Sequence, residues 1–536
     1  MSSFNLNFAA ISPTVLIAVP MLICFFTLMI VVGLSCRKHS ANVDGFVLGG
    51  RSVGPWLTAF AFGTSYFSAV IFVGYAGQFG WNFGLASTWI GLGNAFIGSL
   101  LAWSVLGRRT RVMTQHLGSK TMPDFFEKRY DSRLLKIVAS VIVFVFLIPY
   151  TASLYNGLSS LFNNVFSIPY WSVVVIMAVL TGVYVIFGGY MATAINDFIQ
   201  GIIMLVGIVV VIWSVLAQNR GLTQAVETLA KNEGAEFSSV FGPNPIALLF
   251  VVLLTSLGTW GLPQMVGKFY SIKDEDSIKK GTIISTVFAV VVASGCYFLG
   301  GFGRLYKGQM EANGFILGNS VMFDKVIPSM LSDLAPVVVS LVIVLVLAAS
   351  MSTLSSLVLT SSSTLTLDVV NPLFSRKKEI SEKKSVLTMR LFIVFFIAIS
   401  AIIAILKDSV WKDSVFIAQM MGVSWGALAG AFLAPFMYGL YWKKTTKAAV
   451  AASFVFGTGL ELIQLCISVG WLTVNDGMLG FVFTNSLYSG VFAMVGGLII
   501  VPIVSLFTQK NLPSNIDDKF SCYDVAVVTN KKDSLG

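Results

Sequence analysis

The stretch that decides the fold is Phe62-Gly63-Thr64-Ser65-Tyr66-Phe67-Ser68, which interrupts an apolar segment with small polar groups. Between Arg51 and Arg108, around this stretch, the chain has no charged residue. One interpretation of the small residues is helix packing, because small residues let membrane helices approach closely. The other is a helix that breaks inside the membrane, where freed carbonyls can bind a cation and freed N–H groups can face a solute.

A second interruption lies in a later apolar segment, Ser256-Leu257-Gly258-Thr259-Trp260-Gly261-Leu262-Pro263. If the chain contains two repeats of five helices, the two interruptions occupy equivalent positions, in the second and seventh membrane spans. Interrupted hydrophobic segments at corresponding positions of two halves are the usual sign of a transporter's binding site. The pairing therefore favours broken helices over simple helix packing.

The composition places the whole chain in a membrane. Of its 536 residues, 56% are hydrophobic and 11% are charged, and the mean hydropathy is +0.83. A soluble protein of this size would need a far more charged surface, which excludes soluble enzymes, nucleic-acid binders and disordered scaffolds. A membrane span needs about 20 mostly apolar residues. We predict an all-α integral membrane protein with thirteen spans, at about 12–35, 54–80, 84–107, 135–163, 168–188, 192–217, 246–266, 281–303, 336–366, 388–406, 415–441, 448–470 and 481–508.

The basic residues predict the orientation. Most of the 35 Lys and Arg residues, Lys268 among them, follow the first, third, seventh, ninth or eleventh span or lie in the C-terminal tail. These loops share one side of the membrane, and an excess of Lys and Arg marks the cytoplasmic side. The N-terminus is therefore predicted outside and the C-terminus inside. The net charge of +10 is then a sign of orientation, with a minor contribution from lipid headgroups, and not of nucleic-acid binding.

The ninth span carries the densest group of hydroxyls, in Ala348-Ala349-Ser350-Met351-Ser352-Thr353-Leu354-Ser355-Ser356. On a helix, Ala349, Ser352, Thr353 and Ser356 share one face, because their spacing is i, i+3, i+4 and i+7. One interpretation is that these hydroxyls only donate hydrogen bonds to the carbonyl four residues earlier, as is common in membrane helices. A helix contact rarely needs so many polar groups, however, and hard cations such as Na⁺ prefer oxygen ligands.

Asp197 is predicted at the cytoplasmic end of the sixth span. A carboxylate inside a membrane is costly and is by default a functional hypothesis. The alternative is an interfacial residue that caps the helix N-terminus.

The other polar residues do not indicate an enzyme site. We interpret Glu461 as structural, and the two histidines, His39 and His116, have no nucleophile or metal ligand near them in the sequence. The five cysteines show no paired spacing, so we predict no disulfide framework, no enzyme site and no cofactor.

Taken together, these motifs resemble the sodium:solute symporter family, which includes proline, pantothenate, sialic acid and sodium–glucose transporters. The resemblance runs from about Val43 to Lys447. One position differs from the family pattern: Tyr190 follows two glycines, where members of the family usually have Leu, Met or Phe. The matching segments are Tyr184-Val185-Ile186-Phe187-Gly188-Gly189-Tyr190-Met191-Ala192, Asn196-Asp197, Gln200-Gly201, Gly45-Phe46-Val47-Leu48-Gly49-Gly50-Arg51-Ser52-Val53-Gly54 and Ala349-Ser350-Met351-Ser352-Thr353-Leu354-Ser355.

The resemblance implies a LeuT-type inverted repeat of ten helices, here spans two to eleven, with three further helices around it. The expected organisation is an N-terminal helix and loop over 1–53, repeats over 54–217 and 218–441, two peripheral helices over 442–508 and a cytoplasmic tail over 509–536. Carried over by position, a first Na⁺ site is similar to the carbonyls of Thr64, Phe67 and Ala349 with the hydroxyls of Ser352 and Thr353. Members with a second sodium use an aspartate and two serines, which look like Asp197, Ser355 and Ser356 here.

The expected solute pocket is formed by residues of three spans: Tyr66, Ser68, Tyr150, Thr255, Thr259 and Trp260. In the proline branch a tyrosine aligning with Tyr150 lines the pocket, but that branch has an acidic residue where this chain has Tyr66. The stretch Gly261-Leu262-Pro263 looks more like the pantothenate branch. The fourth span lacks the Arg of the sialic acid branch, and we expect no basic side chain at this depth. A multiply charged anion would therefore enter almost unpaired.

We expect a secondary sodium:solute symporter that imports an amino acid such as proline, or a small carboxylate such as pantothenate, by alternating access. The alternatives are a sodium-coupled sugar or sialic acid transporter and, outside active transport, a transmembrane sensor or channel on the same fold. A channel would need polar residues along several helices, and a sensor would need a signalling domain that the tail is too short to hold. The expected partners are the solute, Na⁺ and membrane lipids, with the protein acting as a monomer in the plasma membrane of a bacterium.

Overall fold

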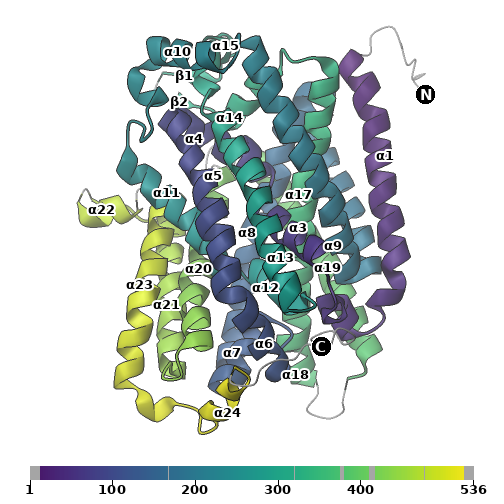
Figure 1. The fold of residues 1–536 in the computed structure, drawn as a ribbon, viewed down its shortest axis with the longest axis vertical. Helices are drawn as coiled ribbons and strands as arrows, with labels where there is room; N and C mark the ends of the chain where they lie inside the picture. Colours follow the sequence, from purple (N-terminus) through teal and green to yellow (C-terminus); the bar gives the residue numbers. More distant parts are fainter. Residues whose placement is uncertain are drawn as a thin grey trace.

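The computed structural model describes residues 12–166, 168–318, 320–374, 380–409, 417–475, 477–483 and 485–523. The chain forms a bundle of long helices (Figure 1). Two short strands, β1 (Ile316–Leu317) and β2 (Ser320–Val321), pair antiparallel in one of the loops. The first residues of the chain, the basic residues 376–378 and the end of the predicted tail, with Lys531 and Lys532, lie outside the described residues.

The helices begin and end as follows in chain order: α1 (Pro13–Ser35), α2 (Val43–Leu48), α3 (Pro55–Tyr66), α4 (Ala76–Phe83), α5 (Thr88–Gly93), α6 (Arg108–His116), α7 (Met122–Tyr130), α8 (Arg133–Phe166), α9 (Tyr170–Gln218), α10 (Leu222–Glu233), α11 (Pro245–Leu257), α12 (Pro263–Ser271), α13 (Glu275–Ala289), α14 (Gly295–Gly300), α15 (Lys307–Ala312), α16 (Val326–Leu331), α17 (Pro336–Thr364), α18 (Asn371–Phe374), α19 (Glu382–Ser409), α20 (Ile417–Tyr441), α21 (Lys447–Ser468), α22 (Met478–Phe483), α23 (Ser486–Phe507) and α24 (Ile516–Ser521). Short 3₁₀ and π turns join several of them into longer rods.

Ten helical rods in the described residues are long and apolar enough to cross a membrane, and there are eleven if the bent pair Pro245–Gly261 and Pro263–Ser271 counts as one span. The chain is therefore a multi-pass membrane protein. Two of these rods, Val70–His116 and Tyr170–Gln218, each cover parts of two spans predicted from the sequence. This joining explains why the count of rods is lower than the thirteen predicted spans.

The rod α9 cannot cross the membrane in a straight line. Its 49 residues would extend about 74 Å, whereas the hydrocarbon core of a bilayer is about 30 Å thick. At Gly189 the backbone leaves the helix, with φ 57° and ψ −147°, a conformation in which a Cβ atom would be strained. Asn196 donates a hydrogen bond to the Met29 carbonyl in α1, and Gly33, one turn further along α1, packs against Tyr184. The two halves of α9 therefore fold back and lie side by side.

Both helix breaks predicted from the sequence are confirmed. Helix α3 ends at Tyr66, Phe67 is extended with ψ 109°, and helical structure resumes at Val70. Helix α11 continues through a 3₁₀ turn to Gly261, and α12 begins at Pro263 with a bend of 47°. A proline at the first position of a helix is favourable there, since no hydrogen bond from its nitrogen is needed.

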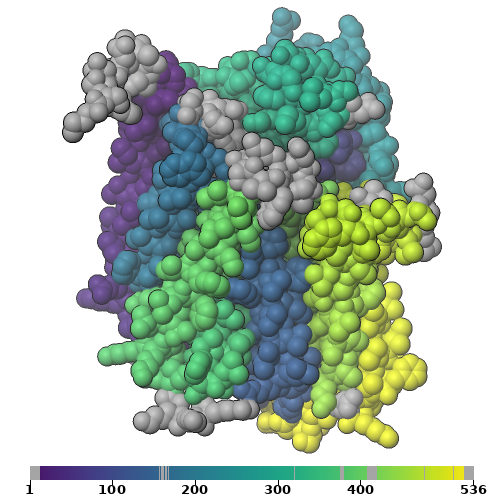
Figure 2. All heavy atoms as spheres, turned by 180° about the vertical axis from the view of Figure 1, so that it is seen from behind, coloured from purple at the N-terminus to yellow at the C-terminus, as the bar shows by residue number. Residues whose placement is uncertain are grey.

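Small elements cover the two ends of the bundle, and long helices form its sides. The hairpin β1–β2 lies near α10 and α15 at one end, whereas α7, α18 and α24 lie at the other (Figure 1). Seen from behind, α8 runs between α19 and α21 (Figure 2). Helices α17 and α20 form the interior, because most of their residues are buried. The polar residues of α17 therefore face protein and not lipid.

Candidate functional site

The five oxygens predicted to bind a first Na⁺ come together where α3 ends beside α17. Ser352 Oγ lies 3.2 Å from the Thr64 carbonyl oxygen and 3.0 Å from the Ala349 carbonyl oxygen. Thr353 Oγ1 lies 3.2 Å from the Thr64 carbonyl oxygen and 3.4 Å from that of Phe67. All five residues are fully buried. The break in α3 is what lets these groups meet, since an unbroken helix would use the Thr64 carbonyl for its own hydrogen bond.

The spacing of these oxygens suits a small hard cation. Ca²⁺, an ion close to Na⁺ in size, binds oxygens at about 2.3–2.6 Å. Two oxygens at right angles around such an ion would lie about 3.3–3.7 Å apart. In the structure the hydroxyls of Ser352 and Thr353 donate hydrogen bonds to the carbonyls at 3.0–3.4 Å, so the oxygens would need to move apart only slightly to hold the ion. Each oxygen belongs to a hydroxyl or a main-chain carbonyl, so the cluster carries no formal charge and no group that exchanges protons near neutral pH.

The second predicted cation site already contains a charged group from the chain itself. Asp197 in α9 and Ser356 in α17 are buried. Lys268 Nζ lies 3.6 Å from Asp197 Oδ2 and donates a hydrogen bond of 3.0 Å to Ser356 Oγ. The hydroxyl of Ser355 instead donates to the Ser352 carbonyl, at 2.9 Å. The structure thus places an ammonium group between two of the three predicted ligands.

The position of Lys268 corrects the prediction that it lies in a cytoplasmic loop. It belongs to α12 and is only 2% exposed. After the bend at Leu262 the chain forms a second short helix instead of an exposed loop, and nearly all the residues from Pro263 to Ser271 are buried within the protein. Burying one charge alone would be costly, so Lys268 and Asp197 stabilise each other.

A cavity of about 50 Å³ lies next to this ion pair, lined by Lys268, Ser356 and Tyr190 among others. A water molecule needs about 10–15 Å³, so a few could fit. Lys120 also lines the cavity, and its side chain is 34% exposed. The cavity therefore extends from the buried pair toward the end of the bundle that holds α7.

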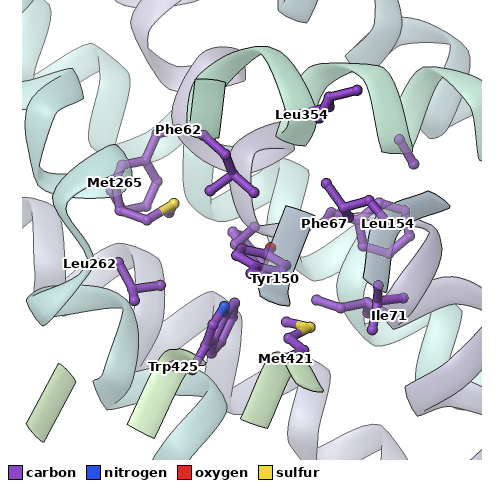
Figure 3. Packing of buried hydrophobic residues seen from close by; sticks show 14 of the residues in the cluster. Phe62, Phe67, Ile71, Tyr150, Leu154, Leu262, Met265, Leu354, Met421 and Trp425 are labelled. Atoms are coloured by element: carbon purple, nitrogen blue, oxygen red, sulfur yellow. The ribbon is translucent and has the colours of Figure 1, made fainter. Parts of the chain in front are cut away.

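Three buried polar groups meet in an apolar part of the core, between α8, α20 and the break that follows α3. The Tyr150 hydroxyl lies near Ser68 and Trp425, and the Tyr150 ring meets the Trp425 indole edge-on, with 6.1 Å between centroids. Met421 and Leu262 lie around them (Figure 3). Tyr150 Oη, Ser68 Oγ and Trp425 Nε1 are close enough to interact with one another, but among the described residues none of them makes a hydrogen bond of good geometry. Converging polar groups in apolar walls are typical of a small-molecule site.

The seventh-span residues predicted for the same pocket make helix contacts instead. Trp260 Nε1 donates to the Ile97 carbonyl at 3.0 Å, and Thr259 Oγ1 lies 3.3 Å from the Gly98 carbonyl. The Thr255 hydroxyl donates to the carbonyl four residues earlier in its own helix, at 2.8 Å. The structure therefore brings Ser68 and Tyr150 together, while it places Thr259 and Trp260 against the helical segment Asn94–Leu101.

Sequence reasoning missed Lys268 and Trp425 as site residues. Trp425 lies in Gly422-Val423-Ser424-Trp425-Gly426, where small and polar residues interrupt an apolar span. This is the same kind of signal that singled out the broken helices, so it could have been found. Tyr66, which was predicted, is buried, and its hydroxyl has no hydrogen bond within the described part of the chain.

Charged residues join three helical segments at the α7 end of the bundle. Lys136 Nζ lies 2.8 Å from Asp124 Oδ1 and 3.6 Å from Asp368 Oδ1. Burial would raise the pKa of the Asp124 carboxyl, but Lys136 and Lys128 hold this pKa below its ordinary value. The cluster links α7, α8 and the turn after α17, and so stabilises their packing at this end.

Comparisons with known proteins agree with this geometry. A model of the sodium:solute symporter family matches residues 46–457, which is most of the chain. The sodium/proline symporter of Staphylococcus aureus is 27% identical over 509 residues, covering 91% of this chain and 92% of that protein. The corresponding protein of Staphylococcus aureus strain JH9 is 28% identical over 510 residues.

Two solved structures share the fold at low sequence identity. The substrate-bound, outward-open structure of a Na⁺-coupled sialic acid symporter has a TM-score of 0.72 at 16% identity, covering 92% of this chain and 98% of that one. The structure of Mhp1, a nucleobase-cation-symport-1 family transporter in a closed conformation, has a TM-score of 0.50 at 12% identity and covers 89% and 98%. These likenesses establish the transporter fold that the resemblance implies. The chain belongs to the sodium:solute symporter family.

Proposed function

We propose that the protein is a secondary active symporter that uses the Na⁺ gradient to import a small organic solute by alternating access. The observation that carries this proposal is the convergence of five neutral oxygens at the break in α3. We assign Thr64, Phe67, Ala349, Ser352 and Thr353 to a Na⁺ site. A neutral oxygen shell suits Na⁺, whereas coupling to H⁺ would need a titratable group there.

We further propose that the solute is an amino acid, with proline first, or a small carboxylate such as pantothenate. The 27% identity to a sodium/proline symporter supports this class. Ser68, Tyr150 and Trp425 offer polar groups that make no hydrogen bond of good geometry among the described residues, against apolar walls. A solute carboxylate would face the N-terminal end of the helical segment that resumes after Ser68, where the helix dipole is positive. Lys268 is engaged by Asp197 and is not free to pair with a second anionic group.

Tyr66, Thr255, Thr259 and Trp260 remain part of the proposed pocket in a supporting role. Hydrogen bonds from Thr259 and Trp260 to the segment Asn94–Leu101 hold the break in the seventh predicted span in place. In the inverted-repeat architecture that break faces the solute. These residues would therefore affect solute binding indirectly, by fixing the position of the break.

The proposed topology has thirteen crossings, with the N-terminus outside, the C-terminus inside and the inverted repeats over 54–217 and 218–441. The breaks at Gly84 and Gly189 support the count, because each divides a rod that covers two predicted spans. The basic loops support the orientation. We propose that the protein works as a monomer in a bacterial plasma membrane, in contact with lipids, and has neither an enzyme activity nor a cofactor.

A thermal-shift screen of the purified protein tests the proposal. Each candidate solute is added in Na⁺ or in K⁺, and a ligand that binds only the folded protein raises the unfolding temperature. We expect Na⁺ alone to stabilise the protein and a small amino acid or carboxylate to stabilise it further, in Na⁺ only. Equal stabilisation in K⁺ would contradict sodium coupling, and a response restricted to sugars would contradict the solute class.

A further inference from the structure

Lys268 makes the contacts that a cation at the second predicted position would make. Its Nζ lies 3.6 Å from Asp197 Oδ2 and 3.0 Å from Ser356 Oγ. A Na⁺ at this position would use the same carboxylate and hydroxyl oxygens. The ammonium group therefore already takes up the ligands that a second sodium would need.

An aromatic ring adds a third contact to the ammonium group. Lys268 Nζ lies 5.3 Å from the centre of the Tyr190 ring, within the range of a cation–π interaction. Helix α9, through Asp197 and Tyr190, and helix α17, through Ser356, thus supply groups that favour a positive charge at this point.

The charge balance at this position leaves no room for a second positive ion. Asp197 is fully buried and Lys268 is 2% exposed, so water screens their charges only weakly. One carboxylate balances one ammonium group, and an added Na⁺ would share that carboxylate with the ammonium group, so that two positive charges would repel each other at close range. Asp197, Ser355 and Ser356 therefore do not fit a second Na⁺ while Lys268 is in place.

We propose that Lys268 is a built-in substitute for a second sodium ion, so that the protein binds one Na⁺ in each transport cycle. The inference rests on the proposed sodium coupling and specifies its stoichiometry. Ser356 Oγ lies 3.0 Å from Ser65 Oγ, and Ser65 follows Thr64, whose carbonyl belongs to the first site. The ammonium group is thus linked to the helix that holds the exchangeable ion, but it is itself never released.

Counting bound Na⁺ on the purified full-length protein tests this proposal without knowledge of the solute. Radioactive ²²Na⁺ is added over a range of concentrations, and bound ion per chain is measured at saturation. We expect one Na⁺ on the wild-type protein and two on Lys268→Met, because this change keeps the unbranched apolar part of the side chain, removes the ammonium group and frees Asp197 and Ser356. Lys268→Arg keeps the charge and should bind one. The double variant Asp197→Asn/Lys268→Met loses both charges and should also bind one.

Two results would overturn the role of Lys268. The first is a wild-type protein that saturates at two Na⁺ per chain, which requires no variant. The second is a Lys268→Met protein that keeps a cooperative unfolding transition and still saturates at one; if this variant does not fold, Lys268→Gln is judged in the same way. A wild-type protein that binds no Na⁺ would overturn sodium coupling itself, and this inference with it.

Discussion

Two positions one helical turn apart on α17 differ in how they could hold a buried positive charge. At the first, Ser352 and Thr353 meet main-chain carbonyls in a cluster without formal charge. At the second, Ser356 meets the ion pair of Asp197 and Lys268. Neutral oxygens can bind a small cation and release it again, whereas a buried ion pair is costly to separate. If the first position binds Na⁺ as proposed, one helix contacts both an exchangeable and a fixed positive charge.

Separating the fixed pair should have the largest effect on stability. Asp197→Asn leaves the Lys268 ammonium buried without a carboxylate, and we expect it to lower the free energy of unfolding by about 3–5 kcal/mol. Asp197→Asn/Lys268→Met leaves no unpaired charge and should recover a large part of this loss. Thermal unfolding in detergent measures both variants.

A matched control for this prediction is the exposed pair of Lys280 and Asp276, which lie 2.7 Å apart on α13. Asp276→Asn should leave the unfolding temperature unchanged, because water screens exposed ion pairs. If the single and double variants of the buried pair were equally destabilised, the ion pair would not be what stabilises the second position.

Removing hydroxyls from the first position should weaken Na⁺ binding without a comparable loss of stability. Ser352→Ala or Thr353→Ala removes one oxygen ligand, and we expect a cost of about 1–3 kcal/mol, or roughly 10- to 100-fold in Na⁺ affinity. The Na⁺ concentration for half-maximal thermal stabilisation measures this change. Ser340→Ala is the control, since the Ser340 hydroxyl donates to a carbonyl of its own helix, at 2.7 Å from Pro336 O. Unchanged Na⁺ affinity in both variants would move the site elsewhere.

Changes in the proposed solute pocket should leave both cation positions intact. Tyr150→Phe removes a hydroxyl near Ser68 and Trp425, and we expect roughly a 10-fold loss of solute affinity, from about 1–2 kcal/mol. Tyr150→Ala should raise the apparent KM further, because it also removes the ring. Tyr438→Phe serves as the control, because its hydroxyl donates to the Leu498 carbonyl in a peripheral helix. A Tyr150 variant that lost its Na⁺ response and kept its solute affinity would show that the pocket is misplaced.

The smallest expected effect concerns the aromatic contact at the second position. Tyr190→Leu removes the ring beside Lys268, and we expect a loss of about 1 kcal/mol of stability. Tyr190→Phe keeps the ring and should lose less. Thermal unfolding of the two variants, measured side by side, separates the cation–π contact from the hydroxyl. A greater loss in Tyr190→Phe than in Tyr190→Leu would contradict the role of the ring.

The breaks in the helices and the convergence at Thr64 and Ser352 could be predicted, because they depend on local signals. Small polar residues inside an apolar run are visible in the sequence, and the helical period places Ser352, Thr353 and Ser356 on one face. The burial of Lys268 could not be predicted in this way. A lysine after an apolar run ordinarily marks a loop, whereas here the chain continues after the bend at Leu262 into a second, buried helix.

The pairing of residues from distant spans was likewise beyond the sequence. Tyr150 and Trp425 are far apart along the chain and meet only through the packing of α8 against α20. The contacts of Trp260 and Thr259 depend on which side of α11 faces the segment Asn94–Leu101, and a helix with apolar residues all round does not indicate this from its period. Membrane helices lose much of the amphipathic signal that orients helices in soluble proteins.

Uptake into proteoliposomes tests the central claim, sodium coupling through a neutral oxygen site, most directly. The solute selected by the thermal-shift screen, with proline tried first, is supplied outside vesicles that contain the purified protein. At constant pH, an inward Na⁺ gradient should drive accumulation, and replacing Na⁺ by choline should abolish it. Ser352→Ala/Thr353→Ala should behave in Na⁺ as the wild-type protein does in choline. Undiminished accumulation driven by a pH gradient alone, without Na⁺, would contradict the claim.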